Sequence, residues 1–214
     1  MREEMIAAVR DEEIDIQRFF DALSEKTKMH SRQVAKLTEG LLFRVQREKA
    51  CEDEPLIWPL SDIYRAVLYH DIGMALIPER LFRKNDELTG PERRVIQRHA
   101  GYGAKLIDKY RTAHHYPPEE ESMWQLAAEV AGSHHERWDG RGYPFGLLAT
   151  AVPLVSRAVA ITDTYDSIVN GTYFRMALPH EYALLEITDN AGTQFDPVLV
   201  DILTQYESAI CLTD

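Results

Sequence analysis

The chain contains 214 residues, of which 45% are hydrophobic and 28% are charged, and these values predict one sizeable globular core or at most two small domains. A formal net charge of −11 argues against a general nucleic-acid-binding surface, because such a surface needs a basic patch. No apolar run is long enough to cross a bilayer, and the acidic N-terminal segment is not a secretory signal. The two cysteines, Cys51 and Cys211, lack motif spacing and are expected to be free thiols. We therefore expect a cytoplasmic protein with neither DNA nor membrane as its partner.

The first two predicted helices follow from the spacing of hydrophobic residues. Apolar side chains recur at close to helical periodicity between residues 4 and 24. Thr27 is a candidate N-cap for a second helix. The apolar face of that helix would consist of Val34, Leu37, Leu41 and Leu42. The acidic, proline-containing segment 51–59 then breaks the pattern and predicts a loop.

The remaining predicted elements are also helices. One begins near Ser61 and delivers His70 and Asp71 near its end, and the next opens at Pro91 and carries His99. Residues 114–122 contain two prolines and an acidic run, which favours a loop. Further helices are predicted over residues 124–133, 152–169, 181–188 and 197–208. The fold class predicted from these elements is all-α.

The segment 134–144, HHERWDGRGYP, is the most informative part of the chain. It places two adjacent histidines just before a glycine-rich turn. Adjacent imidazoles are rarely needed for packing, and histidine is the commonest metal ligand. The pair His70 and Asp71, and a second acidic patch that begins at Asp163, point in the same direction. Together they suggest a metal site that is built from several segments of the chain.

Each of these residues also has an ordinary structural interpretation. A single histidine such as His30 or His99 on an amphipathic helix is more often a half-buried structural residue than a ligand. Asp71 or Asp163 alone would more often be a helix cap or a surface charge. His114, His115 and His180 have no motif partner and are expected to lie on the surface. Helix spacing by itself does not bring the candidate ligands together.

The order of the motifs resembles the HD-GYP branch of the HD superfamily of metal-dependent phosphohydrolases, over roughly residues 27 to 205. The matching segments are KMHSRQVAKL (28–37), HDIG (70–73), IPERLF (77–82), LTGPE (88–92), RHAGYGAKLI (98–107), HHERWDGRGYPFGL (134–147), VPLVSRAVAITDTYD (152–166) and GTQFDP (192–197). This resemblance implies an HD-domain helical bundle with a metal site in its core. It divides the chain into an N-terminal helical extension, residues 1–26, and an HD-GYP-like phosphohydrolase domain, residues 27–214.

The resemblance also implies a ligand set and an activity. The implied metal ligands are His30, His70, Asp71, His99, His134, His135 and Asp163. Two divalent metals, iron or manganese, would be held by these residues, since imidazole suits transition metals and carboxylates bridge them. The implied reaction is hydrolysis of a cyclic dinucleotide such as cyclic di-GMP by a metal-activated hydroxide, with Asp71 as the catalytic residue. Tyr143, Arg175 and Arg137 are the implied substrate-binding residues.

Three departures from the family pattern qualify these expectations. Met74 stands where the family usually has a lysine after the HDIG motif, and Thr172 stands where it usually has an arginine. Arg175 retains the second arginine of that run. Lys26 replaces a glutamate that members with a third metal carry, which favours two metals. Losing two cationic phosphate contacts weakens substrate binding more than it damages metal ligation.

Two other functions remain open beside the phosphodiesterase. The first is a catalytically weakened HD-GYP module that acts as a nucleotide receptor or interaction domain. The second is a nucleotide phosphomonoesterase, the commonest activity of the wider superfamily. A homodimer or a signalling partner is compatible with either. Turnover with Mn²⁺ or Fe²⁺ separates the receptor from the enzymes, and the preferred substrate separates the two enzymes.

Overall fold

The computed structural model describes residues 14–82, 84, 87–173 and 176–210, and over these residues the regular secondary structure is helical, without β-strands. This confirms the all-α fold class. The helices are α2 (Ile16–Asp21), α3 (Glu25–Glu48), α4 (Leu60–Val67), η1 (Ile72–Leu76), η2 (Glu79–Leu81), α5 (Gly90–Ala113), α6 (Pro118–Ser133), η3 (Ala149–Ala151), α7 (Leu154–Val169), α8 (His180–Asp189), α9 (Pro197–Gln205) and α10 (Glu207–Ile210).

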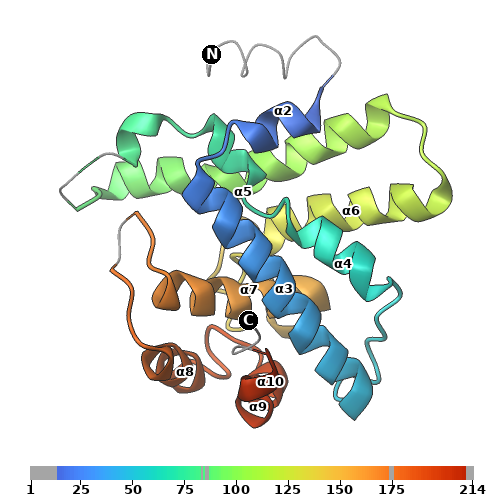
Figure 1. Ribbon diagram of the computed structural model, residues 1–214, viewed down its shortest axis with the longest axis vertical. Helices are drawn as coiled ribbons and strands as arrows, with labels where there is room; N and C mark the ends of the chain where they lie inside the picture. Colours follow the sequence, from blue (N-terminus) through green and yellow to red (C-terminus); the bar gives the residue numbers. More distant parts are fainter. Residues whose placement is uncertain (1–13, 83, 85–86, 174–175, 211–214) are drawn as a thin grey trace.

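Helix α3 crosses the middle of the molecule and packs against α4 and α7 (Figure 1). Its buried side includes the predicted apolar face, since Val34, Leu37, Leu41 and Leu42 are all buried. The predicted N-cap was wrong. Ser24 caps the helix, and its hydroxyl oxygen accepts a hydrogen bond from the backbone N–H of Thr27 at 3.0 Å. Both residues suit a cap chemically, and the extended backbone of Ser24 decides between them.

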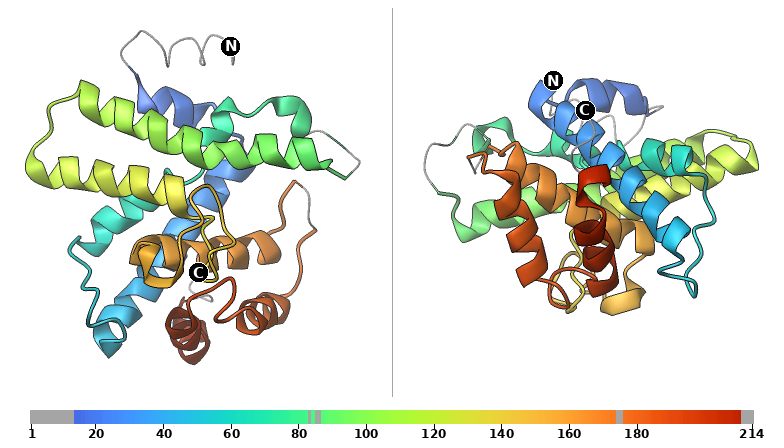
Figure 2. Two further views of the ribbon diagram at one scale, coloured as in Figure 1. Left: turned by 180° about the vertical axis from the view of Figure 1, so that it is seen from behind. Right: turned by 60° about the horizontal axis from the view of Figure 1, so that its bottom comes forward.

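Helices α5 and α6 form an antiparallel pair on the other side of the molecule, as seen from behind in Figure 2. Thr89 and Glu92 form a capping box at the start of α5, which agrees with the predicted opening of this helix. The predicted loop 114–122 was too long, because α6 already begins at Pro118. A proline at the first helical position and three glutamates in the first turn both favour a helix start there.

Helices α7, α8 and α9 form the lower part of the molecule in Figure 1, with α7 packed against α3. Asp196 caps α9 as predicted, by accepting a hydrogen bond from the N–H of Val198. The same carboxylate forms a buried ion pair with Arg157 of α7, whose guanidinium also contacts Glu54. This network fastens the start of α9 to the centre of the bundle.

The N-terminal part of the chain is described from Ile14 onward. The first thirteen residues of the predicted extension 1–26 lie outside the described residues, while α2 packs against η1 and α5. The division of the chain at residue 26 therefore stays a prediction. Among the described helices, none is both long enough and apolar enough to cross a membrane.

Candidate metal centre

The structure brings all seven predicted ligands to one place. They come from five separate segments: His30 from α3, His70 and Asp71 from the turn between α4 and η1, His99 from α5, His134 and His135 from the end of α6, and Asp163 from α7. Four of them, His70, Asp71, His99 and His134, are buried. A local motif could not have produced this set, because the segments are joined only by the packing of the helices.

Asp71 lies at the centre of the cluster, and its two carboxylate oxygens face different histidines. Its Oδ1 is 3.2 Å from Nε2 of His99 and 3.8 Å from Nε2 of His134. Its Oδ2 is 3.8 Å from Nε2 of His70 and 4.0 Å from Nε2 of His30. The backbone of Asp71, at φ −100° and ψ 10°, lies in the sparsely populated bridge region in which many active-site residues are found. One carboxylate therefore faces two groups of histidines.

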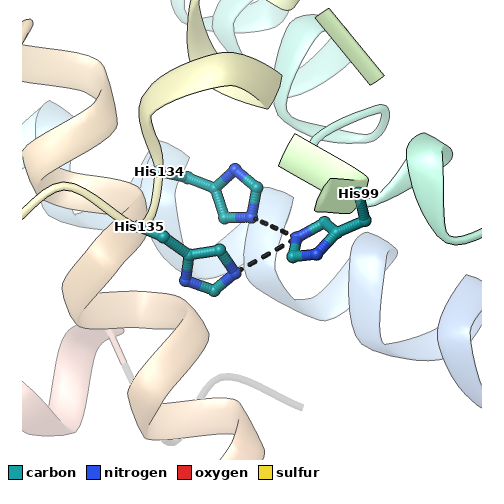
Figure 3. Close-up of side chains that lie close together, drawn as sticks. All are labelled: His99, His134 and His135. Atoms are coloured by element: carbon teal, nitrogen blue, oxygen red, sulfur yellow. Dashed lines mark hydrogen bonds between the residues drawn. The ribbon is translucent and has the colours of Figure 1, made fainter. Parts of the chain in front are cut away.

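The first half of the cluster consists of His99, His134 and His135 (Figure 3). Nε2 of His99 is 3.3 Å from Nε2 of His134 and 3.1 Å from Nε2 of His135. Nδ1 of His99 donates to the carbonyl oxygen of Ile96, and Nδ1 of His134 donates to that of Val130. In a neutral imidazole this leaves Nε2 as a bare acceptor, so two acceptors face each other. A cation between them relieves that repulsion.

The second half consists of His30, His70 and Asp71. Nδ1 of His70 donates to the carbonyl oxygen of Val67, while its buried Nε2 has no hydrogen-bond partner among the described residues. A buried nitrogen without a partner is costly, and a metal ion is one way to satisfy it. Nε2 of His30 lies 3.0 Å from Oδ1 of Asp163, which adds a second carboxylate to this half.

The electrostatics of the cluster favour neutral imidazoles in its buried part. Burial lowers the pKa of His70, and burial with the nearby His135 and His70 lowers the pKa of His134 well below its ordinary value. Burial and the nearby His99 lower the pKa of His135 to about 4. Neutral imidazole is the form that binds metals. These histidines therefore have the protonation state of ligands.

His30 and the two carboxylates form the charged part. Burial alone would lower the pKa of His30, but hydrogen bonds with Asp163 and Asp166 outweigh it and raise that pKa well above its ordinary value. Burial alone would raise the pKa of Asp71 and of Asp163, but the surrounding histidines lower both. Both aspartates are therefore ionised. A metal that binds beside His30 would displace its proton.

The donor set fits divalent transition metals. It offers imidazole nitrogens whose other ring nitrogen is held by a carbonyl or carboxylate, the usual support of a metal-bound histidine. Carboxylates complete the set, and imidazole nitrogen with carboxylate oxygen is a donor combination that divalent transition metals accept. The unpartnered Nε2 of His70 and the facing nitrogens of His99 and His134 show that the residues fit bound cations.

A hollow of about 240 Å³ opens onto this cluster. His30, Asp71, His99, His135 and Asp163 form part of its wall. The remaining described wall residues are Lys26, Thr27, Met74, Phe82, Ile96, Tyr143, Ser167, Gly171, Thr172 and Tyr173. The hollow is therefore a concave site that combines an acidic, histidine-rich floor with largely apolar and aromatic walls.

The glycine-rich loop after α6 is held by its own polar residues. Glu136 is buried and accepts hydrogen bonds from the backbone N–H groups of Phe145 and Leu147. Gly140 and Gly146 have φ of +74° and +67°, and this left-handed conformation explains the preference for glycine there. The loop thereby holds the ring of Tyr143 stacked on His135, with ring centroids 4.8 Å apart.

The three predicted substrate-binding residues lie in different places. Tyr143 lines the hollow beside the cluster. Arg137 forms an ion pair with Asp139, donates to Gln194, and lines a second hollow of about 320 Å³, which shares His135, Tyr143 and Asp163 with the first. Arg175 lies outside the described residues. Their roles in binding a substrate stay predictions.

The expected surface positions of three other histidines were partly wrong. His115 is exposed, but His114 and His180 are half-buried. The ring of His114 stacks on Tyr116, and Nδ1 of His180 is hydrogen-bonded to the hydroxyl group of Tyr165 at 2.6 Å. Aromatic neighbours hold both rings: Tyr116 is two residues from His114, whereas Tyr165 belongs to α7 and is distant in sequence from His180.

Sequence reasoning assigned no role to Asp166, although the structure places it directly behind the cluster. Its Oδ2 is 2.6 Å from Nδ1 of His30, and this orients the His30 ring so that Nε2 faces the other ligands. Asp166 lies three residues after Asp163 on α7, so the two share a helix face. The three-residue spacing of these two acidic residues was the sequence signal that could have identified Asp166 as part of the site.

Comparisons with known proteins identify the family of this chain. The family described as "HD domain" matches residues 20–199. The chain belongs to the HD domain family. Members of this family bind divalent metals, and the histidine and aspartate clusters described above are compatible with that property.

Curated relatives of the HD-domain chain have related names. A "Cyclic di-GMP phosphodiesterase" of Thermotoga maritima is 28% identical over 208 residues, which cover 97% of this chain and 53% of the relative. A "Probable cyclic di-GMP phosphodiesterase" of Vibrio cholerae is 33% identical over 66% of this chain and 32% of the relative. A "3'3'-cGAMP-specific phosphodiesterase 3" of Vibrio cholerae is 32% identical over 83% of this chain and 34% of the relative. The chain thus spans about a third to a half of these relatives.

Two solved structures share the fold of this HD domain. An HDG"Y"P protein from Bdellovibrio bacteriovorus superposes with a TM-score of 0.57 and 20% identity, covering 83% of this chain and 52% of the other. A cyclic GMP-AMP-specific phosphodiesterase of V. cholerae superposes with a TM-score of 0.51 and 21% identity, covering 83% and 43%. The helical fold that the HD-GYP resemblance implied is confirmed.

Proposed function

We propose that this HD domain is a metal-dependent phosphodiesterase that hydrolyses a cyclic dinucleotide such as cyclic di-GMP. The single observation that carries the proposal is the position of Asp71 between two groups of histidines, with one oxygen toward each. The names of the relatives support the substrate class, since they refer to cyclic di-GMP and 3'3'-cGAMP. A hollow with aromatic walls over the cluster supports a nucleotide ligand.

Each half of the cluster would hold one metal, iron or manganese. His99, His134 and His135 would bind the first, and His30, His70 and Asp163 the second, with Asp71 shared between them. Two bound divalent metals would supply charge stabilisation for phosphate oxygens and lower the pKa of a bound water. Asp166 and the backbone carbonyls behind His70, His99 and His134 keep the donor nitrogens turned toward the centre.

Tyr143 is the wall residue best placed to position the substrate. Burial, with the nearby charges of Asp163 and Asp71, raises the pKa of its hydroxyl group above the ordinary value. The phenol therefore stays protonated and keeps an O–H that donates to a phosphate oxygen. Its stacking on His135 places this donor beside the first half of the cluster. Tyr143 thus binds and orients, while Asp71 is the catalytic residue.

A nucleotide receptor is the second candidate function, and Met74 is the observation that favours it. Met74 lines the hollow and carries no charge, and Thr172, which also lines it, carries none either. A hollow with few cations binds a phosphate weakly and stabilises charge development poorly. A phosphomonoesterase would need a monoester substrate, which substrate profiling would detect directly.

Metal content and turnover together test the proposal. We expect the purified chain to contain close to two equivalents of iron or manganese, measured by elemental analysis, and to hydrolyse cyclic di-GMP in their presence. Removal of the metals with a chelator should stop hydrolysis, and Mn²⁺ should restore it. Bound metals without hydrolysis of any phosphodiester would favour the nucleotide receptor. Hydrolysis of monoesters alone would favour the phosphomonoesterase.

A lysine restored at position 74 should increase activity. Met74 is half-buried on the wall of the hollow, so Met74→Lys would place an ammonium group beside a bound phosphate. A hydrogen bond to a charged group contributes about 1.5–3 kcal/mol, so kcat/KM for cyclic di-GMP should rise roughly tenfold or more. Adding Thr172→Arg should raise it further.

The control for this experiment is Met29→Lys, which adds the same charge on α3 at a residue that is 66% exposed and outside the hollow. It should leave kcat/KM unchanged. If neither Met74→Lys nor the double variant exceeds this control, the substrate differs from cyclic di-GMP or the missing cations do not limit activity.

A further inference from the structure

We propose that Lys26 is the substrate-binding cation of this hollow and that it contacts the phosphodiester of a cyclic dinucleotide that is not being cleaved. This rests on the proposed function. A cyclic dinucleotide carries two phosphodiester groups, and the metal centre would hold one of them. The other needs a cation elsewhere in the hollow, because its charge would otherwise face Asp71 and Asp163.

Lys26 is the only lysine or arginine among the described residues that line the hollow. The two positions at which the family usually carries cations, Met74 and Thr172, are uncharged in this chain. Any described cationic contact to an anion bound there must therefore come from Lys26. The net charge of −11 makes a local cation more important for capturing an anionic ligand.

The ammonium group of Lys26 is held in place before any ligand binds. Its Nζ donates a hydrogen bond to the backbone carbonyl oxygen of Thr172 at 3.0 Å and lies 5.9 Å from the centre of the Tyr173 ring. The hydroxyl group of Tyr173 is in turn hydrogen-bonded to Ser24, at the N-cap of α3. An ammonium group has three N–H donors, so the carbonyl of Thr172 leaves donors for a phosphate.

The position of Lys26 assigns it to the rim and not to the metal centre. It precedes His30 by four residues on α3, so the two side chains lie on the same face one turn apart. Lys26 is exposed, whereas His70, His99 and His134 at the floor are buried. A phosphate bound at the floor and a cation at the rim fit a ligand with two separated phosphates.

The aromatic wall beside Lys26 suits the base attached to such a phosphate. The rings of Phe82 and Tyr173 lie 5.3 Å apart, and both residues line the hollow. Aromatic side chains stack on nucleobases, and the faces of all bases suit such stacking. Lys26, Phe82 and Tyr173 together form a surface for one nucleotide next to the metal centre.

The test compares Lys26→Met with Lys28→Met on two substrates. Lys28 lies on the same turn of α3, pairs with the exposed Glu25, and does not line the hollow, so its variant makes the same chemical change elsewhere. The substrates are cyclic di-GMP, which has two phosphodiesters, and bis(p-nitrophenyl) phosphate, which has one. Kinetics are measured on the Mn²⁺-loaded full chain, with metal content and thermal unfolding recorded for each variant.

We expect Lys26→Met to raise KM for cyclic di-GMP about tenfold or more, the loss of one charge-assisted contact, with little change in kcat. Hydrolysis of bis(p-nitrophenyl) phosphate and the metal content should stay at the wild-type level. Lys28→Met should match the wild type on both substrates. Lys26→Arg keeps the positive charge and should retain most of the affinity for cyclic di-GMP. If only the packing of the aliphatic stem mattered, keeping the charge would not be required for that affinity.

Two results would overturn the assignment of Lys26. One is an unchanged KM for cyclic di-GMP in Lys26→Met, and the other is an equal loss on both substrates, which would place Lys26 at the metal centre. If the wild type binds cyclic di-GMP without cleaving it, the proposed function fails, and the Kd values of the same two variants then decide about Lys26. Should Lys26→Met fold poorly, Lys26→Gln provides the same comparison.

Discussion

Replacement of Asp71 with alanine is expected to abolish hydrolysis of cyclic di-GMP and to reduce the metal content at the same time. Asp71 is the residue whose two oxygens face both halves of the cluster, at 3.2 Å from His99 on one side and 3.8 Å from His70 on the other. Its loss removes one donor from each half and the negative charge that offsets two cations. The expected decrease in kcat is about 1,000-fold or more, because the bound metals supply both the nucleophile and the charge stabilisation.

The matched control is Asp108→Ala, which removes an exposed carboxylate that pairs with Arg111 on the outer face of α5. It should leave turnover and metal content close to the wild-type values, since exposed ion pairs contribute little. Asp71→Asn preserves the shape of the side chain and should still lose most activity. An Asp71→Ala variant that keeps most of its turnover would rule out the metal-centred reaction and leave the receptor as the better hypothesis.

Much of the fold could be predicted from local patterns because helices depend on local spacing. The face of α3 formed by Val34, Leu37 and Leu41 follows from the 3.6-residue period. The capping box at Thr89 and the cap at Asp196 follow from short-range chemistry. The N-cap of α3 was missed: Thr27 was predicted, but Ser24, three residues earlier, caps the helix, and both side chains suit a cap chemically.

The cluster itself could not be derived from spacing. His30 and Asp163 are separated by most of the chain, and only the packing of α3 against α7 brings their side chains to 3.0 Å. The resemblance to HD-GYP proteins predicted that these residues converge, because a family resemblance implies the arrangement of the whole helical bundle. It did not supply the contact between Lys26 and the carbonyl of Thr172, since both residues depart from the family pattern.

The role of Arg137 shows a similar limit. The family resemblance implied that Arg137 contacts the substrate. In the structure its guanidinium is paired with Asp139 and Gln194, and it lies toward the second hollow. Which partner a long side chain takes depends on neighbours that are distant in sequence, such as Gln194, and local patterns do not record them.

Gly73→Ala is expected to damage both the stability of the bundle and the metal centre. A Cβ atom at position 73 would lie 2.0 Å from the carbonyl oxygen of His99 and 2.6 Å from the backbone N of Gly103. Both atoms belong to the backbone of α5, so no side-chain rotation can relieve the overlap. Helix η1 would have to move away from α5, and Asp71, at the start of η1, would move away from His99 with it.

Gly73→Ala should lower the free energy of unfolding by about 3 kcal/mol, the upper part of the range for overpacking a tight interface. In a domain of this size, that loss lowers the unfolding temperature by roughly 6–12 °C. Thermal unfolding of the metal-free chain measures this effect without any contribution from ligands. Metal content then measures the displacement of Asp71, and it should fall even at temperatures at which the variant is fully folded.

Gly101→Ala provides the control on α5, because a Cβ atom at position 101 would meet no atom of the described part of the chain within 4 Å. Removing a glycine from the interior of α5 should stabilise the chain by about 0.5–1 kcal/mol and leave the metals in place. If Gly73→Ala instead behaves like Gly101→Ala, then close packing of η1 against α5 is not what fixes Asp71 between the two groups of histidines. The shared position of Asp71 would then have to depend on the α4 side of the turn, where Nδ1 of His70 is held by the carbonyl of Val67.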